Sequence, residues 1–124
     1  MRLILMATLP SLPSAEAQTS GLRWARANPT GVSPTPRIDA PIAYDVPGGR
    51  LVMFGGHDAT GDRNDLWSYS VYRQQWTQPN PGGVPPNPRH GHTVTFDRLR
   101  ERIIIIAGQG AEFFGDLWAI RHPG

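Results

Sequence analysis

The sequence predicts an all-β protein built from two copies of one unit of four short strands. Three observations support this prediction. Glycine (14 residues) and proline (13 residues) occur throughout the 124-residue chain and would interrupt long helices. Short apolar or β-branched runs lie between them, as in strands bounded by turns. The second half of the chain also repeats the first at a displacement of 52 residues.

The repeat aligns residue types that are rare or structurally special. The matched pairs include Trp24 with Trp76, Pro34 with Pro86, Arg37 with Arg89, Asp45 with Asp97, Arg50 with Arg102 and Gly56 with Gly108. After a contraction of one residue, residues 65–67 align with residues 116–118, both reading Asp-Leu-Trp. Because glycine and proline recur at matched positions, they mark turns and are not a sign of low complexity.

Each unit contains the same succession of strand signals. A first strand is expected over 40–44 or 92–96, and an apolar second strand over 51–54 or 103–106. The continuous apolar run of the second strand predicts burial on both faces of the sheet. A third strand follows over 65–71 and a fourth over 75–78, whereas the second unit ends after its third. Residues 22–25 resemble a fourth strand that precedes the first unit.

The combined motifs resemble the kelch repeat, the four-stranded blade of a β-propeller. They are the pair Gly55-Gly56 after an apolar strand, Asn64-Asp65-Leu66-Trp67 followed by Tyr69, the later Trp76, and Pro88-Arg89 followed by His92. The resemblance covers about residues 22–121. The second copy departs from it with Ala107 in place of the first glycine and Ile120 in place of the tyrosine. The resemblance implies a partial kelch-type β-propeller of about two four-stranded antiparallel blades.

The predicted organisation follows the repeat. Residues 1–21 form a candidate signal peptide or an extension, and residues 22–124 hold the two blades. The latter divide into an outer strand and linker (22–36), a first repeat (37–79), a Pro/Gly loop (80–88) and a second repeat (89–121). Propellers have about four to eight blades, so two blades do not close a ring. We expect a fragment of a longer propeller, with a homo-oligomeric ring or a marginally stable piece as alternatives.

Several repeat positions are expected to be structural. The glycines would permit a close approach of backbone where the second strand ends. The tryptophans would fill space between blades, the arginines would bond carbonyls or acids between blades, and the aspartates would brace the third strand. The set is Arg37, Gly55, Gly56, Asp65, Trp67, Trp76, Arg89, His92, Gly108, Asp116 and Trp118.

The first residues have the outline of a secretory signal. Arg2 precedes an apolar stretch over 3–9, and an Ala-Glu-Ala step follows at 15–17. If residues 1–17 are such a signal, the protein is secreted or periplasmic; otherwise it is cytoplasmic. The apolar stretch is too short for a membrane span, which needs about 20 residues.

Composition excludes several kinds of chemistry. All twelve basic residues are arginine, they are spread along the chain, and the net charge is only +2, so nucleic-acid binding is not indicated. The chain contains no cysteine, which removes disulfides, thiolate metal sites and cysteine nucleophiles. It contains no phosphate-binding loop or nucleophile-elbow motif, and no cofactor is expected.

Two groups of residues are candidates for chemistry. His90 and His92 would point to the same side of a strand, which suits a metal, but no third ligand suggests itself, and a structural role for His92 is favoured. Carboxylate pairs for glycoside hydrolysis could be drawn from four acids, but nothing in the sequence fixes the separation that such pairs need. These are Asp58, Asp62, Glu112 and Asp116. No catalytic residue and no metal ligand is predicted.

The favoured function is a non-catalytic interaction scaffold that binds a protein, a small molecule or a glycan. The loops at one end of the blades, residues 56–64 and 108–115, are the expected contact surface. Its candidate residues are His57, Asp58, Asp62, Arg63, Gln109, Glu112, Phe113 and Phe114. The alternative is a fragment of a galactose oxidase-like or other carbohydrate-active propeller enzyme. The resemblance implies that the copper site of such an oxidase needs a tyrosine cross-linked to cysteine, and this chain has no cysteine.

Overall fold

The computed structural model describes Pro10 and residues 21–121, and every regular element among them is a β-strand. This described part holds no helix of the length and apolar character that a membrane span requires. The candidate signal over residues 1–17 lies outside the described residues, apart from Pro10.

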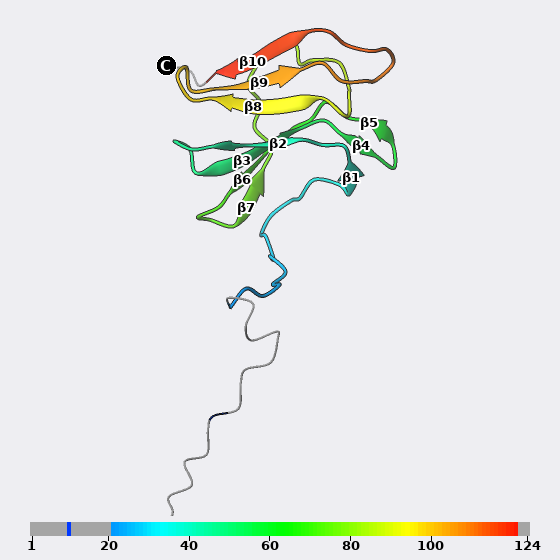
Figure 1. The fold of residues 1–124 in the computed structure, drawn as a ribbon. Helices are drawn as coiled ribbons and strands as arrows, with labels where there is room; N and C mark the ends of the chain where they lie inside the picture. Colours follow the sequence, from blue (N-terminus) through cyan, green and yellow to red (C-terminus); the bar gives the residue numbers. More distant parts are fainter. Residues whose placement is uncertain (1–9, 11–20, 122–124) are drawn as a thin grey trace, which may run out of the picture.

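The first blade is a four-stranded antiparallel meander. Its strands are β2 (Ile42–Asp45), β3 (Arg50–Phe54), β6 (Leu66–Ser70) and β7 (Gln75–Thr77), and they pair in that order (Figure 1). The order confirms the four-strand unit expected from the repeat. Each expected strand shifts by only one or two residues, since strand ends depend on pairing with a neighbour.

The second blade has three strands in the same succession. They are β8 (Thr93–Asp97), β9 (Arg102–Ile106) and β10 (Leu117–Arg121), ordered β10-β9-β8. In the described chain β10 pairs with β9 alone, so its other edge carries no strand. The internal repeat is visible in the registers: Asp45 faces Arg50 across the first turn, as Asp97 faces Arg102 across the second. The paired side chains are 2.7 and 3.0 Å apart.

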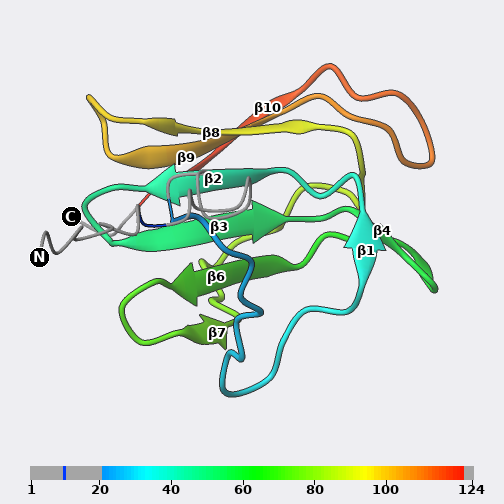
Figure 2. The same ribbon diagram turned by 60° about the horizontal axis from the view of Figure 1, so that its bottom comes forward.

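The hydrophobic core lies between the two blades, whose sheets stack in both views (Figures 1 and 2). The apolar second strands lie at its centre: Val52 and Phe54 from β3 face Ile103 and Ile105 from β9, and Ile105 is completely buried. Met53 and Ile104, on the opposite faces of these strands, are buried as well, as the continuous apolar runs predict. Burying one such side chain contributes about 1.5–3 kcal/mol. Neither sheet could bury its inner face alone.

A small third sheet joins β1 (Arg37–Ile38) to the hairpin of β4 (His57–Asp58) and β5 (Gly61–Asp62), where the sequence predicts only a loop. The hairpin is short enough to escape a periodicity signal. Its turn is closed by Asp58, whose Oδ1 accepts hydrogen bonds from the Thr60 backbone N–H at 2.9 Å and hydroxyl at 2.7 Å. Gly61 supplies a φ of +118°, which side chains disfavour.

The structure differs from expectation at residues 22–25, which form no strand. Trp24 is fully exposed, although its repeat partner Trp76 packs in β7. A strand needs a neighbouring edge, and no sheet edge accompanies residues 22–25. The chain first pairs with the first blade at Thr30, which forms a parallel bridge with Gln75 at the edge of the sheet.

Candidate functional site

Two loops with matching places in the repeat lie at the same end of the blades. The β4–β5 hairpin follows the second strand of the first blade, and residues 107–116 follow that of the second. Both views show them at the right-hand end, opposite the β6–β7 and β8–β9 turns (Figures 1 and 2). The repeat therefore brings the two predicted contact loops together on one end of the molecule.

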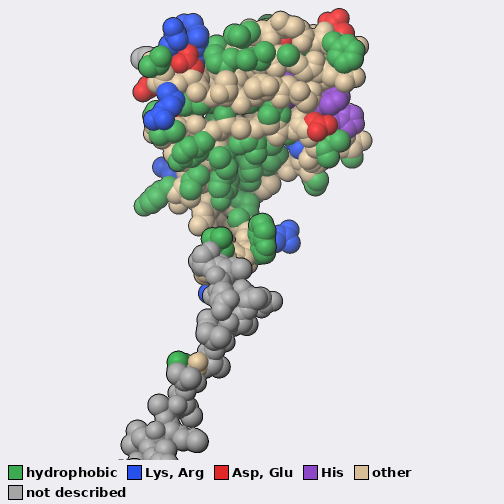
Figure 3. All heavy atoms as spheres, in the orientation of Figure 1, with side chains coloured by type: hydrophobic (Ala, Val, Ile, Leu, Met, Phe, Trp, Pro, Cys, Tyr) green, Lys and Arg blue, Asp and Glu red, His purple; other side chains and the backbone are tan. Residues whose placement is uncertain are grey.

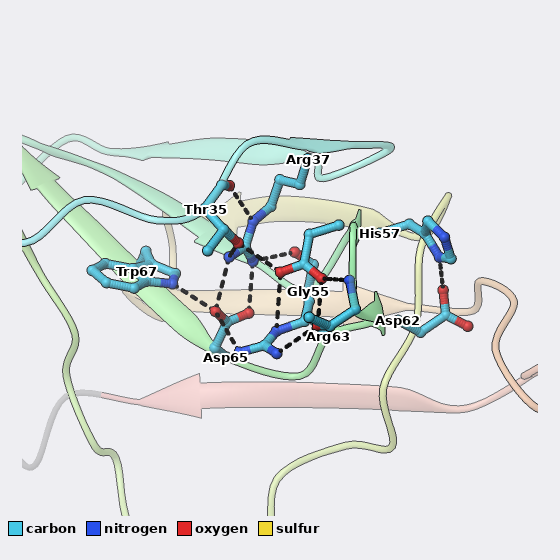
Figure 4. A network of polar contacts seen from close by, with 10 residues as sticks. Thr35, Arg37, Gly55, His57, Asp62, Arg63, Asp65 and Trp67 are labelled. Atoms are coloured by element: carbon cyan, nitrogen blue, oxygen red, sulfur yellow. Dashed lines mark hydrogen bonds and ion pairs between the residues drawn. The ribbon is translucent and has the colours of Figure 1, made fainter.

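Each loop is held by an arginine clamp within its own repeat. The Arg37 guanidinium donates to the Gly55 carbonyl at 2.9 Å and to both carboxylate oxygens of Asp65 at 2.7 and 3.0 Å. Arg89 repeats the arrangement, with Ala107 at 2.9 Å and Asp116 at 2.6 and 2.9 Å. The expectation that these arginines link different blades is wrong, since each side chain bonds to the residue that precedes the third strand of its own repeat. Figure 4 shows this contact for Arg37 and Asp65.

The aspartates of the clamps also orient the tryptophans of the third strands. Asp65 accepts from the Trp67 indole N–H at 2.8 Å, and Asp116 from that of Trp118 at 2.7 Å. The Arg89 hydrogen bonds, aided by the indole, hold the pKa of Asp116 well below its ordinary value. Trp67 packs edge-to-face on Trp76 of the same blade, with ring centroids 6.4 Å apart. The contact between these two rings lies within one blade, whereas the sequence suggested that the tryptophans fill space between blades.

Two glycines allow the lead-in to each first strand to pass the end of each second strand. Gly56 has a φ of +95°, and a Cβ there would lie 2.6 Å from the Ala40 Cβ. Gly108 has a φ of +102°, and a Cβ there would lie 2.7 Å from the His92 Cβ. Both the backbone conformation and the space exclude a larger residue.

The second repeat is bonded to the first through its lead-in segment. The Gly56 N–H donates to the Arg89 carbonyl at 2.8 Å, and the Arg89 N–H donates to the Arg63 carbonyl at 3.0 Å. His92 Nε2 donates to the Phe54 carbonyl at 2.8 Å. Burial lowers the pKa of His92, so the ring is neutral near pH 7 with its proton on Nε2. The two blades are therefore bonded to each other at the end that carries the contact loops, and we call this region the joint between the blades.

His57, Asp62 and His90 converge on this joint. The Asp62 Oδ1 accepts hydrogen bonds from Nδ1 of both histidines at 2.7 Å. One potential ligand atom from each residue lies within 4.8 Å of the other two. The bond from His57, reinforced by that from His90, lowers the pKa of Asp62 despite some burial. The carboxylate is therefore ionised and faces two imidazoles (Figure 4 shows its contact with His57).

The sequence suggested His90 and His92 as a pair of metal ligands, but the structure does not bring these two side chains together. His90 and His92 do not share one side of a strand, because both precede β8 and Gly91 between them has a φ of +63°. His92 turns into the core, while His90 turns to Asp62 of the other repeat. The link between His90 and the hairpin crosses between repeats, so spacing along the chain did not reveal it. The sequence indicated Asp62 only as a candidate residue of the contact loop, and not as a partner of His90.

Of the other three acids, Asp58 and Asp116 form internal contacts, whereas Glu112 is exposed. Asp58 is buried, and the Thr35 hydroxyl at 2.6 Å, followed by Thr60, holds its pKa well below the ordinary value. The Arg63 side chain lies 3.6 Å from Asp58 and 3.9 Å from Asp65 (Figure 4). A general acid for glycoside hydrolysis needs a raised pKa. The lowered pKa values at Asp58, Asp62 and Asp116 are the opposite of that requirement.

The two adjacent phenylalanines have different environments. Phe113 is 83% exposed at the tip of the second loop, together with exposed Glu112. Phe114 instead covers the buried Arg89 guanidinium, whose central carbon lies 4.1 Å from the ring centroid. Gln109 is exposed and bridges backbone to His90 and Phe113. Of the two phenylalanines, Phe113 is thus the one that is exposed to solvent for contact.

Comparison with known proteins agrees with this architecture. A family model described as the KLHDC2/KLHL20/DRC7 Kelch-repeats domain matches residues 14–122. The Rab9 effector protein with kelch motifs from Gallus gallus is 32% identical over 101 residues, covering 78% of this chain and 26% of the relative. Dynein regulatory complex subunit 7 from Chlamydomonas reinhardtii is 38% identical over 76 residues, covering 60% of this chain and 7% of the relative.

A third relative extends the match along the chain. Tip elongation aberrant protein 1 from Schizosaccharomyces pombe is 34% identical over 112 residues, covering 85% of this chain and 9% of that protein. The chain therefore spans about a quarter or less of the length of these relatives. Two stacked antiparallel blades, the matched clamps and the family match together show that this chain belongs to the kelch-repeat family.

Proposed function

We propose that this pair of kelch blades is a protein-interaction module that uses its loop end as the contact surface. The observation that carries the proposal is Phe113, a large apolar side chain 83% exposed on a loop whose base is fixed by Arg89 and Asp116. An exposed aromatic residue on a rigid base loses little conformational entropy on binding, which favours its use as an anchor.

The polar surroundings of Phe113 support a protein partner. Glu112 and Gln109 are exposed beside it, and His57 is half-exposed on the neighbouring hairpin. An apolar centre with a polar rim is typical of protein interfaces. The relatives named as a Rab9 effector and as a dynein regulatory complex subunit are in keeping with this class of function. A small-molecule or glycan ligand remains the competing occupant of the same loops.

A photo-crosslinking residue placed at Phe113 tests the proposal. Leu99 is the matched control, because it is 91% exposed on the β8–β9 turn at the opposite end of the blades. In extracts of cells that produce the chain, we expect a protein to crosslink from position 113 and not from 99. Purified, that protein should bind Phe113→Ser at least tenfold more weakly than wild type. Equal crosslinking from both positions, or unchanged affinity of Phe113→Ser, contradicts the proposal.

We further propose that a strand from outside these two blades pairs with the edge of β10. Leu117 and Trp118 of β10 are 63% and 36% exposed, whereas their counterparts Leu66 and Trp67 are buried where β7 completes the sheet. The added strand comes either from a longer propeller or from a second copy. Light scattering that gives a mass of three or four chains supports the ring of copies. If the mass is that of a single chain and the neighbouring coding sequence holds no further 50-residue repeat, both sources of the added strand are excluded.

A further inference from the structure

The inter-repeat cluster of His57, Asp62 and His90 has the composition of a metal site. Imidazole nitrogen and carboxylate oxygen are the ligands that Zn²⁺ and related first-row divalent cations accept. The three side chains belong to parts of the chain that the fold brings together: His57 and Asp62 face each other across the β4–β5 hairpin, and His90 precedes β8. At the right of Figure 3, histidine side chains (purple) and an acidic side chain (red) lie next to each other at the molecular surface.

The potential ligand atoms of the three side chains already lie close to one another. Two ligands of tetrahedral zinc, each about 2.0–2.1 Å from the ion, are about 3.3 Å apart. The Asp62 Oδ1 already lies 2.7 Å from both Nδ1 atoms, and all three potential ligand atoms lie within 4.8 Å of one another. A divalent cation would take the place of the two Nδ1 protons that now separate the imidazoles from the carboxylate.

The charge around the cluster also suits a cation. Arg63, which directly follows Asp62 in the chain, lies 3.6 Å from Asp58 and 3.9 Å from Asp65, so its charge is partly offset by these carboxylates, although Asp65 also pairs with Arg37 (Figure 4). The side chains of His57, Asp62 and His90 are 47%, 23% and 26% exposed. A cation could therefore enter from solvent and keep a position for water or for a ligand atom from a partner.

From this geometry we propose that His57, Asp62 and His90 form a three-ligand site for Zn²⁺ or a related first-row divalent cation, located at the joint between the two blades. The site holds the hairpin of the first repeat to the lead-in of the second. Bound metal would therefore resist separation of the blades. The proposal does not depend on the interaction function argued above, since it needs no protein partner.

The test is titration of the full chain, free of any affinity tag and dialysed against chelator, with Zn²⁺ by calorimetry and Co²⁺ by absorption. We expect one ion per chain, visible Co²⁺ bands of low-symmetry coordination and a higher thermal midpoint. His57→Gln, Asp62→Asn and His90→Gln should each weaken binding at least tenfold and remove the rise in midpoint. Circular dichroism checks that each variant retains wild-type strand content, and Asp62→Asn keeps an oxygen acceptor for the histidines.

Two control variants remove the same chemical groups elsewhere. His122→Gln removes the fourth histidine of the sequence, and Asp39→Asn removes an exposed carboxylate. Both should bind Zn²⁺ as wild type does. Absence of one-to-one binding by wild type overturns the proposal. So does binding that survives Asp62→Asn or depends on His122 instead.

Discussion

His92 Nε2 lies 2.8 Å from the carbonyl oxygen of Phe54, which connects the lead-in of the second blade to the end of the central strand of the first. The ring also packs edge-to-face on Phe54, with centroids 5.6 Å apart. One histidine thus contributes a hydrogen bond and an aromatic contact at the point where the blades meet. In the described chain the other ring nitrogen, Nδ1, is buried without a hydrogen-bond partner, so the structural role of this residue rests on Nε2.

Replacing His92 tests this role. His92→Leu removes the donor and should lower the free energy of unfolding by about 1–3 kcal/mol, because a carbonyl in a buried joint loses its donor. His92→Gln places an amide N–H near the position of Nε2 and should cost less. Urea unfolding of both variants measures the difference. Equal losses would mean that packing, and not the hydrogen bond, determines the contribution of His92.

The two arginine clamps should differ in the cost of losing the acid. Asp65→Asn leaves Arg37 without its counter-charge at a site where the two side chains are only 4% and 10% exposed, and should cost about 3 kcal/mol or more. Asp116→Asn leaves the completely buried Arg89 without its counter-charge, but should cost less, because the Asp116 side chain is 38% exposed and solvent can replace the lost carboxylate at that end of the clamp. Thermal and urea unfolding rank the two variants. The reverse ranking would contradict burial as the controlling factor.

The close approach at the end of the second strand should make Gly108 intolerant of a side chain. Gly108→Ala meets both a φ of +102° and a contact 2.7 Å from the His92 Cβ, whereas Gly82→Ala meets a φ of +75° in open space. We expect about 1–2 kcal/mol from the backbone conformation at Gly82 and a larger loss at Gly108. Chemical denaturation compares them. Equal losses would show that the neighbouring chain moves aside at little cost.

Acid should weaken the clamp of the second blade. Arg89 holds the pKa of Asp116 below that of the unfolded chain, about 3.9. The unfolded state therefore takes up the proton first, so this contribution to stability is complete above about pH 4 and is lost as the pH falls. The thermal midpoint of Asp116→Asn should fall less steeply between pH 5 and pH 2.5 than that of wild type. Asp39→Asn provides the matched control, and parallel profiles for Asp116→Asn and wild type would contradict the prediction.

The sequence by itself determined the repeating unit and most of its strands. Apolar runs such as residues 103–106 and turn residues such as Gly49 are local signals, and a 52-residue repeat of arginine, glycine and tryptophan positions is specific to the kelch pattern. Such patterns can be recognised without knowing the partner strand, because side-chain alternation and turn formation depend on residues that are neighbours in sequence.

Only the tertiary structure decided which of these residues meet. It placed Arg37 and Arg89 within their own repeats, turned His92 into the joint, and brought His90 to His57 and Asp62. The histidine contacts depend on how one blade stacks on the other, and the arginine clamps depend on how the chain folds back within one repeat. The partners named here are 18 to 38 positions apart in most cases. Pairing at that distance is set by the packing of whole sheets, so spacing along the chain could not reveal it.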